Sequence, residues 1–171
     1  MKALLLSLLL AGPALAQSED ICLQIFDNTK FCGSQIGWQP LDPQPIPHMK
    51  TFRNQEFNFS VSHQSNHGQS VNNILYDSAI RGLLHEIDQR HDTPPGTHQA
   101  AFVELVYKDD IEGRRLAVIS EFDDTPISIV MDIYYSRRQV WIAQTFHVGP
   151  IKMRRLKKVH GFAVKELIFD P

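Results

Sequence analysis

Histidine is the residue type in this sequence that most suggests chemistry, because eight occur along the chain. His63 and His67 are the closest pair, and a spacing of four on a helix would direct both rings at one metal ion. Their segment is polar and contains a glycine, which predicts a loop, so the spacing does not predict a ligand pair. His85, His91 and His98 straddle an expected helix end and match no ligand spacing. We interpret these residues as surface histidines.

No catalytic motif is complete in this sequence. The segment that begins at His85 and Glu86 resembles the zinc-protease pattern H-E-x-x-H, but Gln89 stands where the second histidine is required. There is no G-x-S-x-G nucleophile elbow and no glycine-rich phosphate loop. His160 falls on the apolar face of the expected closing helix, which predicts a core histidine with one backbone partner. We therefore predict no catalytic, cofactor-binding or metal-binding residue, and no cofactor.

Acidic residues gather in two places, at Asp109, Asp110 and Glu112 and again at Asp123 and Asp124. Both groups flank the ends of expected strands, where aspartate favours turns through local hydrogen bonds. A calcium site needs more oxygen ligands in a defined loop. Two alternatives stay open: a hydrolase whose histidine and carboxylate side chains are brought together only by the fold, and a histidine-based metal-binding protein.

The start of the chain has the pattern of a cleavable export signal. Lys2 supplies the positive charge, residues 4–10 form a short apolar run, and small residues at Ala14 and Ala16 favour cleavage before Gln17. The run is shorter than the roughly 20 residues that span a bilayer. No later segment is apolar enough to be transmembrane. The sequence therefore predicts a periplasmic or secreted protein.

Two cysteines, Cys22 and Cys32, follow the predicted cleavage point. In an oxidising compartment such a pair predicts a disulfide bond. A turn signal at Asp27 and Asn28 lies between two apolar flanks, which is typical of a β-hairpin. Redox pairs favour the spacing C-x-x-C, which these cysteines do not have. We predict a hairpin closed by a structural disulfide.

The charge balance is nearly neutral, with 17 Lys and Arg against 19 Asp and Glu, and loss of Lys2 takes the net charge from −2 to −3. This balance argues against nucleic-acid binding, which needs a strongly basic domain. Basic residues are nevertheless concentrated at Arg137 and Arg138 and on one side of the closing helix. The helix residues, which suit an anionic surface or an acidic partner, are Arg154, Lys157, Lys158 and Lys165.

Hydrophobic periodicity predicts an α+β fold in which an antiparallel sheet of about five strands packs with two amphipathic helices, after the disulfide-closed hairpin. Residues 17–50 would hold the hairpin and an extended proline-rich connection, and residues 51–171 a single α+β domain. The expected strands are 57–61, 101–107, 116–122, 127–135 and 140–148, and the expected helices are 71–90 and 151–167.

The last two expected strands allow a test of register. A two-residue turn at Ser136 and Arg137 pairs Ile133 with Val140, and it pairs Met131 with Ile142 on the same face. The other face is mixed, with Asp132 opposite Trp141. We expect partial cover of that face by a second layer formed by the hairpin and the proline-rich connection.

The order of these elements resembles that of the PsbP-like superfamily, single-domain proteins that are exported or sent to the thylakoid lumen. The resemblance covers residues 57–167 and depends on the strand from Phe57 to Val61, the helix after it, the run from Arg115 to Val148 and the closing helix. It implies an antiparallel sheet between helices and a binding or accessory role, with no shared catalytic residue. A cystatin-like sheet wrapped on one helix is the alternative fold.

These observations together predict an exported, non-catalytic accessory or binding protein of the bacterial cell envelope. Its partner would be a protein or another envelope component.

Overall fold

The structure is a computed structural model that describes residues 22–44, 48–65, 85, 103–122, 124–136 and 138–170. In this part of the chain there are two antiparallel sheets, one short 3-10 helix and one α-helix, α2 (Met153–Lys165). The predicted signal peptide at residues 1–16 lies outside the described residues. So does the predicted helix at 71–90, apart from His85.

The larger sheet contains seven strands, two more than the sequence predicted. Their spatial order is β3-β4-β5-β9-β8-β7-β6. In chain order the strands are β3 (Gln39–Pro40), β4 (Met49–Asn54), β5 (Phe57–Ser65), β6 (Val103–Lys108), β7 (Ile111–Phe122), β8 (Thr125–Tyr135) and β9 (Gln139–Val148). The extra strands come from the proline-rich connection and the segment after it. Pro40 lies in the edge strand β3, where a residue without a backbone N–H is tolerated.

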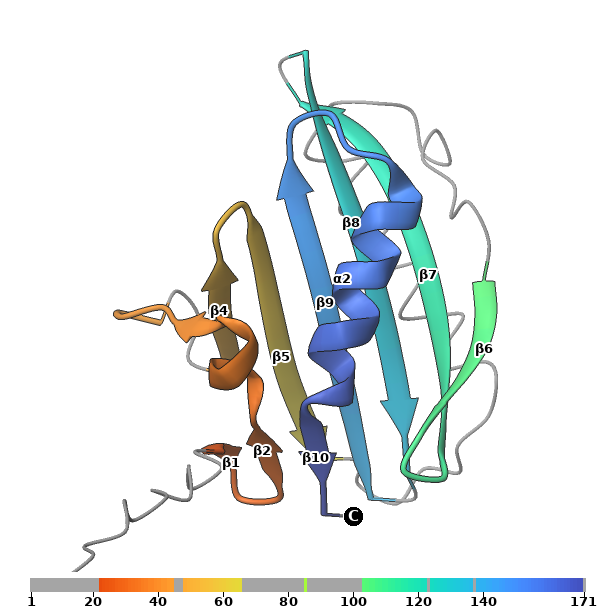
Figure 1. Ribbon diagram of the computed structural model, residues 1–171. Helices are drawn as coiled ribbons and strands as arrows, with labels where there is room; N and C mark the ends of the chain where they lie inside the picture. The colour runs from red at the N-terminus through yellow and green to blue at the C-terminus, as the bar shows by residue number, and fades with distance from the viewer. Residues whose placement is uncertain are drawn as a thin grey trace, which may run out of the picture.

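The smaller sheet joins the two ends of the described chain (Figure 1). It consists of β1 (Leu23–Phe26), β2 (Thr29–Phe31) and β10 (Leu167–Phe169), with β2 in the middle. Cys22 and Cys32 flank the β1-β2 hairpin and are bonded at an S–S distance of 2.07 Å, which confirms the predicted disulfide. The backbone N–H of Cys32 also donates to the carbonyl of Glu166 at 2.9 Å, which adds to the pairing with β10.

The closing helix is shorter than the sequence predicted, because residues 167–169 form a strand. Leu167 and Phe169 are buried while Ile168 between them is exposed, which is the period of a strand and not of a helix. Pairing with β2 and burial of these two side chains override the helical pattern. Among the described residues, no helix combines the length and the apolar character needed to cross a membrane.

Figure 1 shows α2 lying across one face of the larger sheet, over β8 and β9. The main core fills the space between this face, α2 and the smaller sheet. Its largest fully buried side chains include Trp141, Tyr134, Phe52, Phe59, Leu156 and Leu167. A smaller cluster lies on the opposite face and is formed by Leu116, Val118, Met131, Ile133 and Tyr135. The larger core therefore lies on the mixed face of the sheet. This face is covered by α2 and the smaller sheet, more completely than the sequence predicted.

The register between β8 and β9 differs from the predicted one by two residues. Tyr135 pairs with Val140 and Ile133 pairs with Ile142. The turn lies one residue further along the chain than predicted, because the backbone N–H of Ser136 donates to the carbonyl of Gln139 at 2.9 Å and encloses the two residues between them. Because side chains alternate with a period of two, this shift changes every partner but leaves each residue on its predicted face.

Replacing both Cys22 and Cys32 by serine is expected to lower the free energy of unfolding by about 2–3 kcal/mol, because an open hairpin gives the unfolded chain more conformational freedom. Urea unfolding followed by circular dichroism measures this change. A reducing agent should lower the unfolding midpoint of the wild type and leave the double serine variant unchanged. An equal response of both proteins would contradict this role of the bond.

Candidate functional site

A network of ionisable and polar side chains lies in the main core beneath α2. Arg115 on β7 donates to Asp132 on β8 through two nitrogens, Nε and Nη2, each 2.7 Å from a carboxylate oxygen. The Tyr134 hydroxyl donates to Oδ2 of the same carboxylate at 2.8 Å. His160 on α2 approaches that oxygen through Nε2 at 3.1 Å. Its other nitrogen, Nδ1, lies 2.9 Å from Oγ1 of Thr145 on β9.

Strand alternation and register bring these groups together. Asp132 and Tyr134 are two residues apart on β8, so both face α2. Arg115 is the direct cross-strand partner of Asp132 in β7. His160 belongs to the buried stripe of α2, whose other members are Leu156, Ala163 and Val164. The network therefore connects three strands to the helix that covers them.

Burial by itself raises the pKa of the Asp132 carboxyl, because a low-dielectric interior disfavours its charged form. The hydrogen bonds and positive charge of Arg115, with His160 beside it, outweigh burial and hold the pKa of Asp132 well below its usual range. The bond to Asp132 is also the main cause of a raised pKa for Arg115. Burial, together with the Asp132 charge, raises the pKa of Tyr134. Asp132 and Arg115 thus form a charged pair at neutral pH.

The order hydroxyl, imidazole, carboxylate in Thr145, His160 and Asp132 is the order found in nucleophilic hydrolases. A hydrolase also requires that the hydroxyl reach a substrate carbonyl, and here the side chains of all three residues are 0% exposed. The carboxylate is moreover engaged by both Arg115 and Tyr134. This arrangement can fix α2 on the sheet, but it presents no nucleophile to a substrate.

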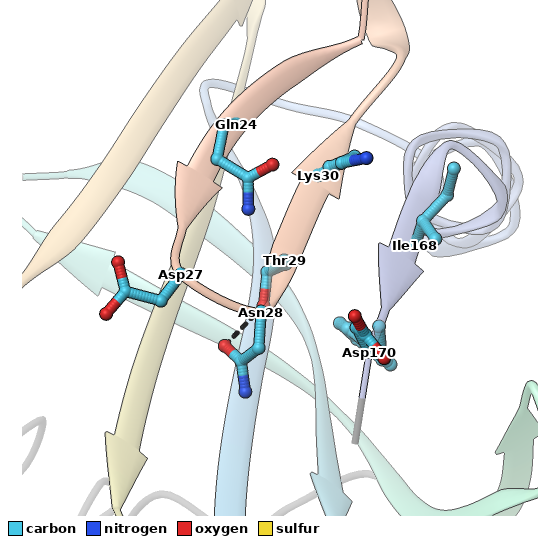
Figure 2. A pocket seen from close by; sticks show the side chains of 8 residues that line it. Gln24, Asp27, Asn28, Thr29, Lys30, Ile168 and Asp170 are labelled. Carbon is cyan, nitrogen blue, oxygen red and sulfur yellow. Dashed lines mark hydrogen bonds between the residues drawn. The ribbon is translucent and has the colours of Figure 1, made fainter.

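A second candidate site is a hollow of about 550 Å³ beside the hairpin turn (Figure 2). It opens to solvent at the smaller sheet and is lined mainly by polar side chains. The lining residues are Gln24, Asp27, Asn28, Thr29, Lys30, Ile168, Phe169 and Asp170. Figure 2 shows Gln24, Lys30 and Ile168 toward one end and Asp27, Asn28 and Asp170 toward the other. Positive and negative groups are thus both present, with no cluster of one type to select a ligand.

The base of this hollow is tied to the larger sheet. The indole Nε1 of Trp141 donates to Oγ1 of Thr29 at 2.9 Å, and Asn28 contacts the side chain of Gln139 on β9. The backbone N–H of Asp170 donates to the carbonyl of Asn28 at 2.9 Å. These contacts explain why polar residues gather at the hairpin turn, since they hold the smaller sheet in place.

The overall arrangement is similar to that of known structures. The solution structure of cyanobacterial PsbP, CyanoP, from Synechocystis sp. PCC 6803 matches with a TM-score of 0.59 and 14% identity, over 84% of this chain and 87% of that one. The chain has a PsbP-like fold. This confirms the predicted resemblance in fold.

Two further solved structures are less similar to this chain. A protein from Bacteroides thetaiotaomicron has a TM-score of 0.48 and 10% identity, over 79% of this chain and 42% of that one. A Pseudomonas aeruginosa protein of unknown function has a TM-score of 0.49 and 15% identity, over 78% of this chain and 82% of that one. The sequence matches no protein-family model and no curated protein.

The structure separates the histidines that the sequence singled out. His63 lies in β5 and not in a loop, with its ring 5.6 Å from the Phe26 ring and 5.7 Å from the Trp141 ring, and burial lowers its pKa. His85 is exposed. His67, His91 and His98 lie outside the described residues. No group of three potential metal ligands occurs within the described part of the chain.

His160 is a core residue as predicted, but its partners are side chains and not a backbone carbonyl. The feature of the sequence that could have indicated these partners is Asp132, a carboxylate inside the strand 127–135 that is otherwise rich in apolar residues. A buried carboxylate requires a cationic partner, and Arg115 is the arginine that the register supplies. The acidic residues Asp109 and Asp110 form the turn between β6 and β7, with φ of 50° and 64°, as their turn interpretation predicted.

Alanine substitutions at two glycines of this chain are expected to have opposite effects. At Gly113 a Cβ atom would lie 2.7 Å from Cδ1 of Tyr134 and 2.8 Å from the carbonyl oxygen of Ile133, so Gly113→Ala should lower the free energy of unfolding by about 1–3 kcal/mol. At Gly161 in α2 a Cβ atom meets no atom within 4 Å, so Gly161→Ala should raise it by about 1 kcal/mol. Urea unfolding of both variants measures the two effects, and a shared sign would contradict the packing described for Tyr134.

Proposed function

We propose that this chain is an exported, non-catalytic accessory or binding protein of the bacterial cell envelope. The observation that carries this proposal is the complete burial of Thr145, His160 and Asp132. The fold brings a hydroxyl, an imidazole and a carboxylate together, but it buries all three beneath α2. The PsbP-like fold supports the same proposal, because the resemblance to that superfamily implies a binding or accessory role.

Export is supported by the disulfide and by the start of the sequence. A Cys22–Cys32 bond persists in an oxidising compartment and is rare in the cytosol. Residues 1–16 have the pattern of a cleavable signal, with cleavage before Gln17. The remaining chain would comprise the disulfide hairpin with its connection at 17–50 and one α+β domain at 51–171. N-terminal sequencing of the protein recovered from the envelope fraction tests the cleavage point.

The alternative function is a hydrolase that uses a histidine and a carboxylate, and their predicted meeting is present at 3.1 Å between His160 and Asp132. Both residues are fully buried, which argues against a hydrolase because a substrate cannot reach them. Two variants at one position discriminate between the functions. Thr145→Ser keeps a hydroxyl next to His160, whereas Thr145→Val removes it and keeps the shape of the side chain.

The experiment screens ester, peptide and phosphate-ester substrates with the wild type and both variants. A parallel cross-linking capture is made from the cell envelope. For an accessory protein we expect no turnover in any of the three proteins, and capture of the same envelope component by the wild type and Thr145→Val. Turnover that survives in Thr145→Ser and disappears in Thr145→Val would overturn the proposal, and so would the absence of any captured component.

A further inference from the structure

The face of α2 that points away from the sheet carries a continuous line of basic and aromatic side chains. Arg154, Lys158, Phe162 and Lys165 are all exposed, and at about 100° per residue they fall within an arc of about 80°. We call these four residues the α2 ridge. The buried stripe that contains Leu156 and Ala163 lies on the opposite side of the helix.

The cations of the ridge differ from the cations beside it. On the flanks of α2, Arg155 contacts Glu56, and Nζ of Lys157 lies 3.4 Å from Oε1 of Glu104. Within the described part of the chain, none of Arg154, Lys158 and Lys165 has an ion pair. The acidic neighbours therefore neutralise the sides of the helix and leave its outer line positively charged, although the chain as a whole has a net charge of −2.

Phe162 is an unusual residue for the outer face of a packed helix. Its side chain is 49% exposed, and Nζ of Lys158 and Nζ of Lys165 lie 5.7 Å and 5.9 Å from its ring centroid. Contact with these lysine side chains covers part of the ring but leaves an apolar surface between two cations. Amphipathic helices that lie in a membrane interface combine aromatic and basic residues in this way, because the ring enters the acyl boundary while the cations meet lipid phosphates.

We propose that the α2 ridge docks the protein on an anionic lipid bilayer, with α2 lying parallel to the membrane plane. This inference rests on the proposed function, since an exported envelope protein works next to membranes. A lipid surface fits the ridge because the ridge is a convex helix face whose charges are single cations of one sign. Docking through α2 leaves the edges of the larger sheet and the hollow at the hairpin free for a protein partner.

The test uses the exported protein, purified after signal removal, and two kinds of vesicle. One kind contains equal parts of phosphatidylglycerol and phosphatidylcholine, and the other contains phosphatidylcholine alone. We expect weak, salt-sensitive co-sedimentation with the anionic vesicles only. The triple variant Arg154→Gln, Lys158→Gln, Lys165→Gln should reduce the partition coefficient by about 100-fold. Phe162→Ala should reduce it by about tenfold.

A matched control removes the same number of charges from the larger sheet, in the triple variant Lys50→Gln, Arg53→Gln, Arg138→Gln, whose residues lie in β4 and in the connection between β8 and β9. It should bind the anionic vesicles within about twofold of the wild type. In Phe162→Trp, the new indole should shift its emission to shorter wavelength when anionic vesicles are added, because Trp38 and Trp141 are already buried. Circular dichroism verifies that each variant is folded.

Equal loss of vesicle binding in the two triple variants would overturn the inference, because it would show a general charge effect. Failure of the wild type to bind anionic vesicles at low salt would also overturn it. If the wild type does not bind vesicles but still captures an envelope protein, the α2 ridge is not a lipid-binding surface, and the proposed accessory function stands. Turnover that depends on Thr145 would instead overturn the proposed function and leave vesicle binding as a separate result.

Discussion

Replacing Asp132 by asparagine is expected to lower the free energy of unfolding by about 3–5 kcal/mol, because the change leaves the buried side of Arg115 without its anion. Asp132 is fully buried and accepts from two nitrogens of Arg115 and from the Tyr134 hydroxyl. Asparagine has nearly the same shape but carries no charge, and its amide N–H groups would point at donors. Urea unfolding at neutral pH measures the loss.

The control is Asp124→Asn, which makes the same chemical change at an exposed turn. Asp124 has φ of 59°, a conformation that asparagine adopts readily, so this variant should stay within about 0.5 kcal/mol of the wild type. The double variant Asp132→Asn, Arg115→Met should recover part of the loss, since removal of both partners leaves no isolated charge. A loss of less than about 1 kcal/mol in Asp132→Asn would contradict the structural role of the pair.

The difference between the wild type and Asp132→Asn should depend on pH. The folded state holds the pKa of Asp132 well below its value of about 3.9 in an unfolded chain. The carboxylate therefore contributes its full stability above that value. This contribution is lost progressively as the pH falls from about 4 toward the folded pKa, because the unfolded state then binds the proton first. Unfolding at about pH 3 should show a smaller difference than at neutral pH. A constant difference would indicate lost packing and not a lost charge.

Sequence periodicity was most informative where a strand or helix buries one face. The alternation of residues 127–135 and 140–148 predicted β8 and β9 and the face of each side chain, and the spacing of Cys22 and Cys32 predicted the bonded hairpin. These features are local, because each depends on neighbours within one strand or one turn. Exact register was not predictable, since moving the turn by one residue moves every partner by two residues without changing any face.

The candidate site depends on contacts that are distant in sequence. Arg115 and Thr145 meet Asp132 and His160 only after β7, β8, β9 and α2 have paired and packed. The sequence placed His160 in the core but assigned it a backbone partner, because a pattern of apolar positions does not indicate which polar side chains face one another. It also placed Asp132 on a mixed face and took that face to be only partly covered. A buried charge among apolar neighbours is itself the signal, since it requires a partner.

The other feature that periodicity missed is β10. A three-residue strand directly after a helix is too short to show alternation against the longer helical pattern. Leu167 continues the buried stripe of α2, so a longer helix also explained its apolar side chain. Pairing with β2 makes these residues a strand, because Phe31 lies opposite Leu167 and Thr29 lies opposite Phe169. The hairpin at the start of the described chain is thus completed by the end of the chain.

Replacing Phe169 by alanine is expected to lower the free energy of unfolding by about 3–5 kcal/mol, an effect as large as that of Asp132→Asn. Phe169 is 5% exposed, and its ring stacks on Trp141 with centroids 4.8 Å apart and lies 5.4 Å from the Tyr134 ring. Its loss would leave a cavity between the smaller sheet and the larger one. Thermal and urea unfolding measure the change, and a shift in tryptophan emission reports on the new surroundings of Trp141.

Ile168 supplies the matched control, because it is the adjacent residue of the same strand and points the other way. Its side chain is 46% exposed and lies against the open hollow beside the hairpin. Ile168→Ala should therefore stay within about 0.5 kcal/mol of the wild type and leave tryptophan emission unchanged. If both variants lost equal stability, β10 would act only through its backbone pairing with β2. A large loss confined to Phe169→Ala would instead establish that the end of the chain holds the two sheets together through the stack on Trp141.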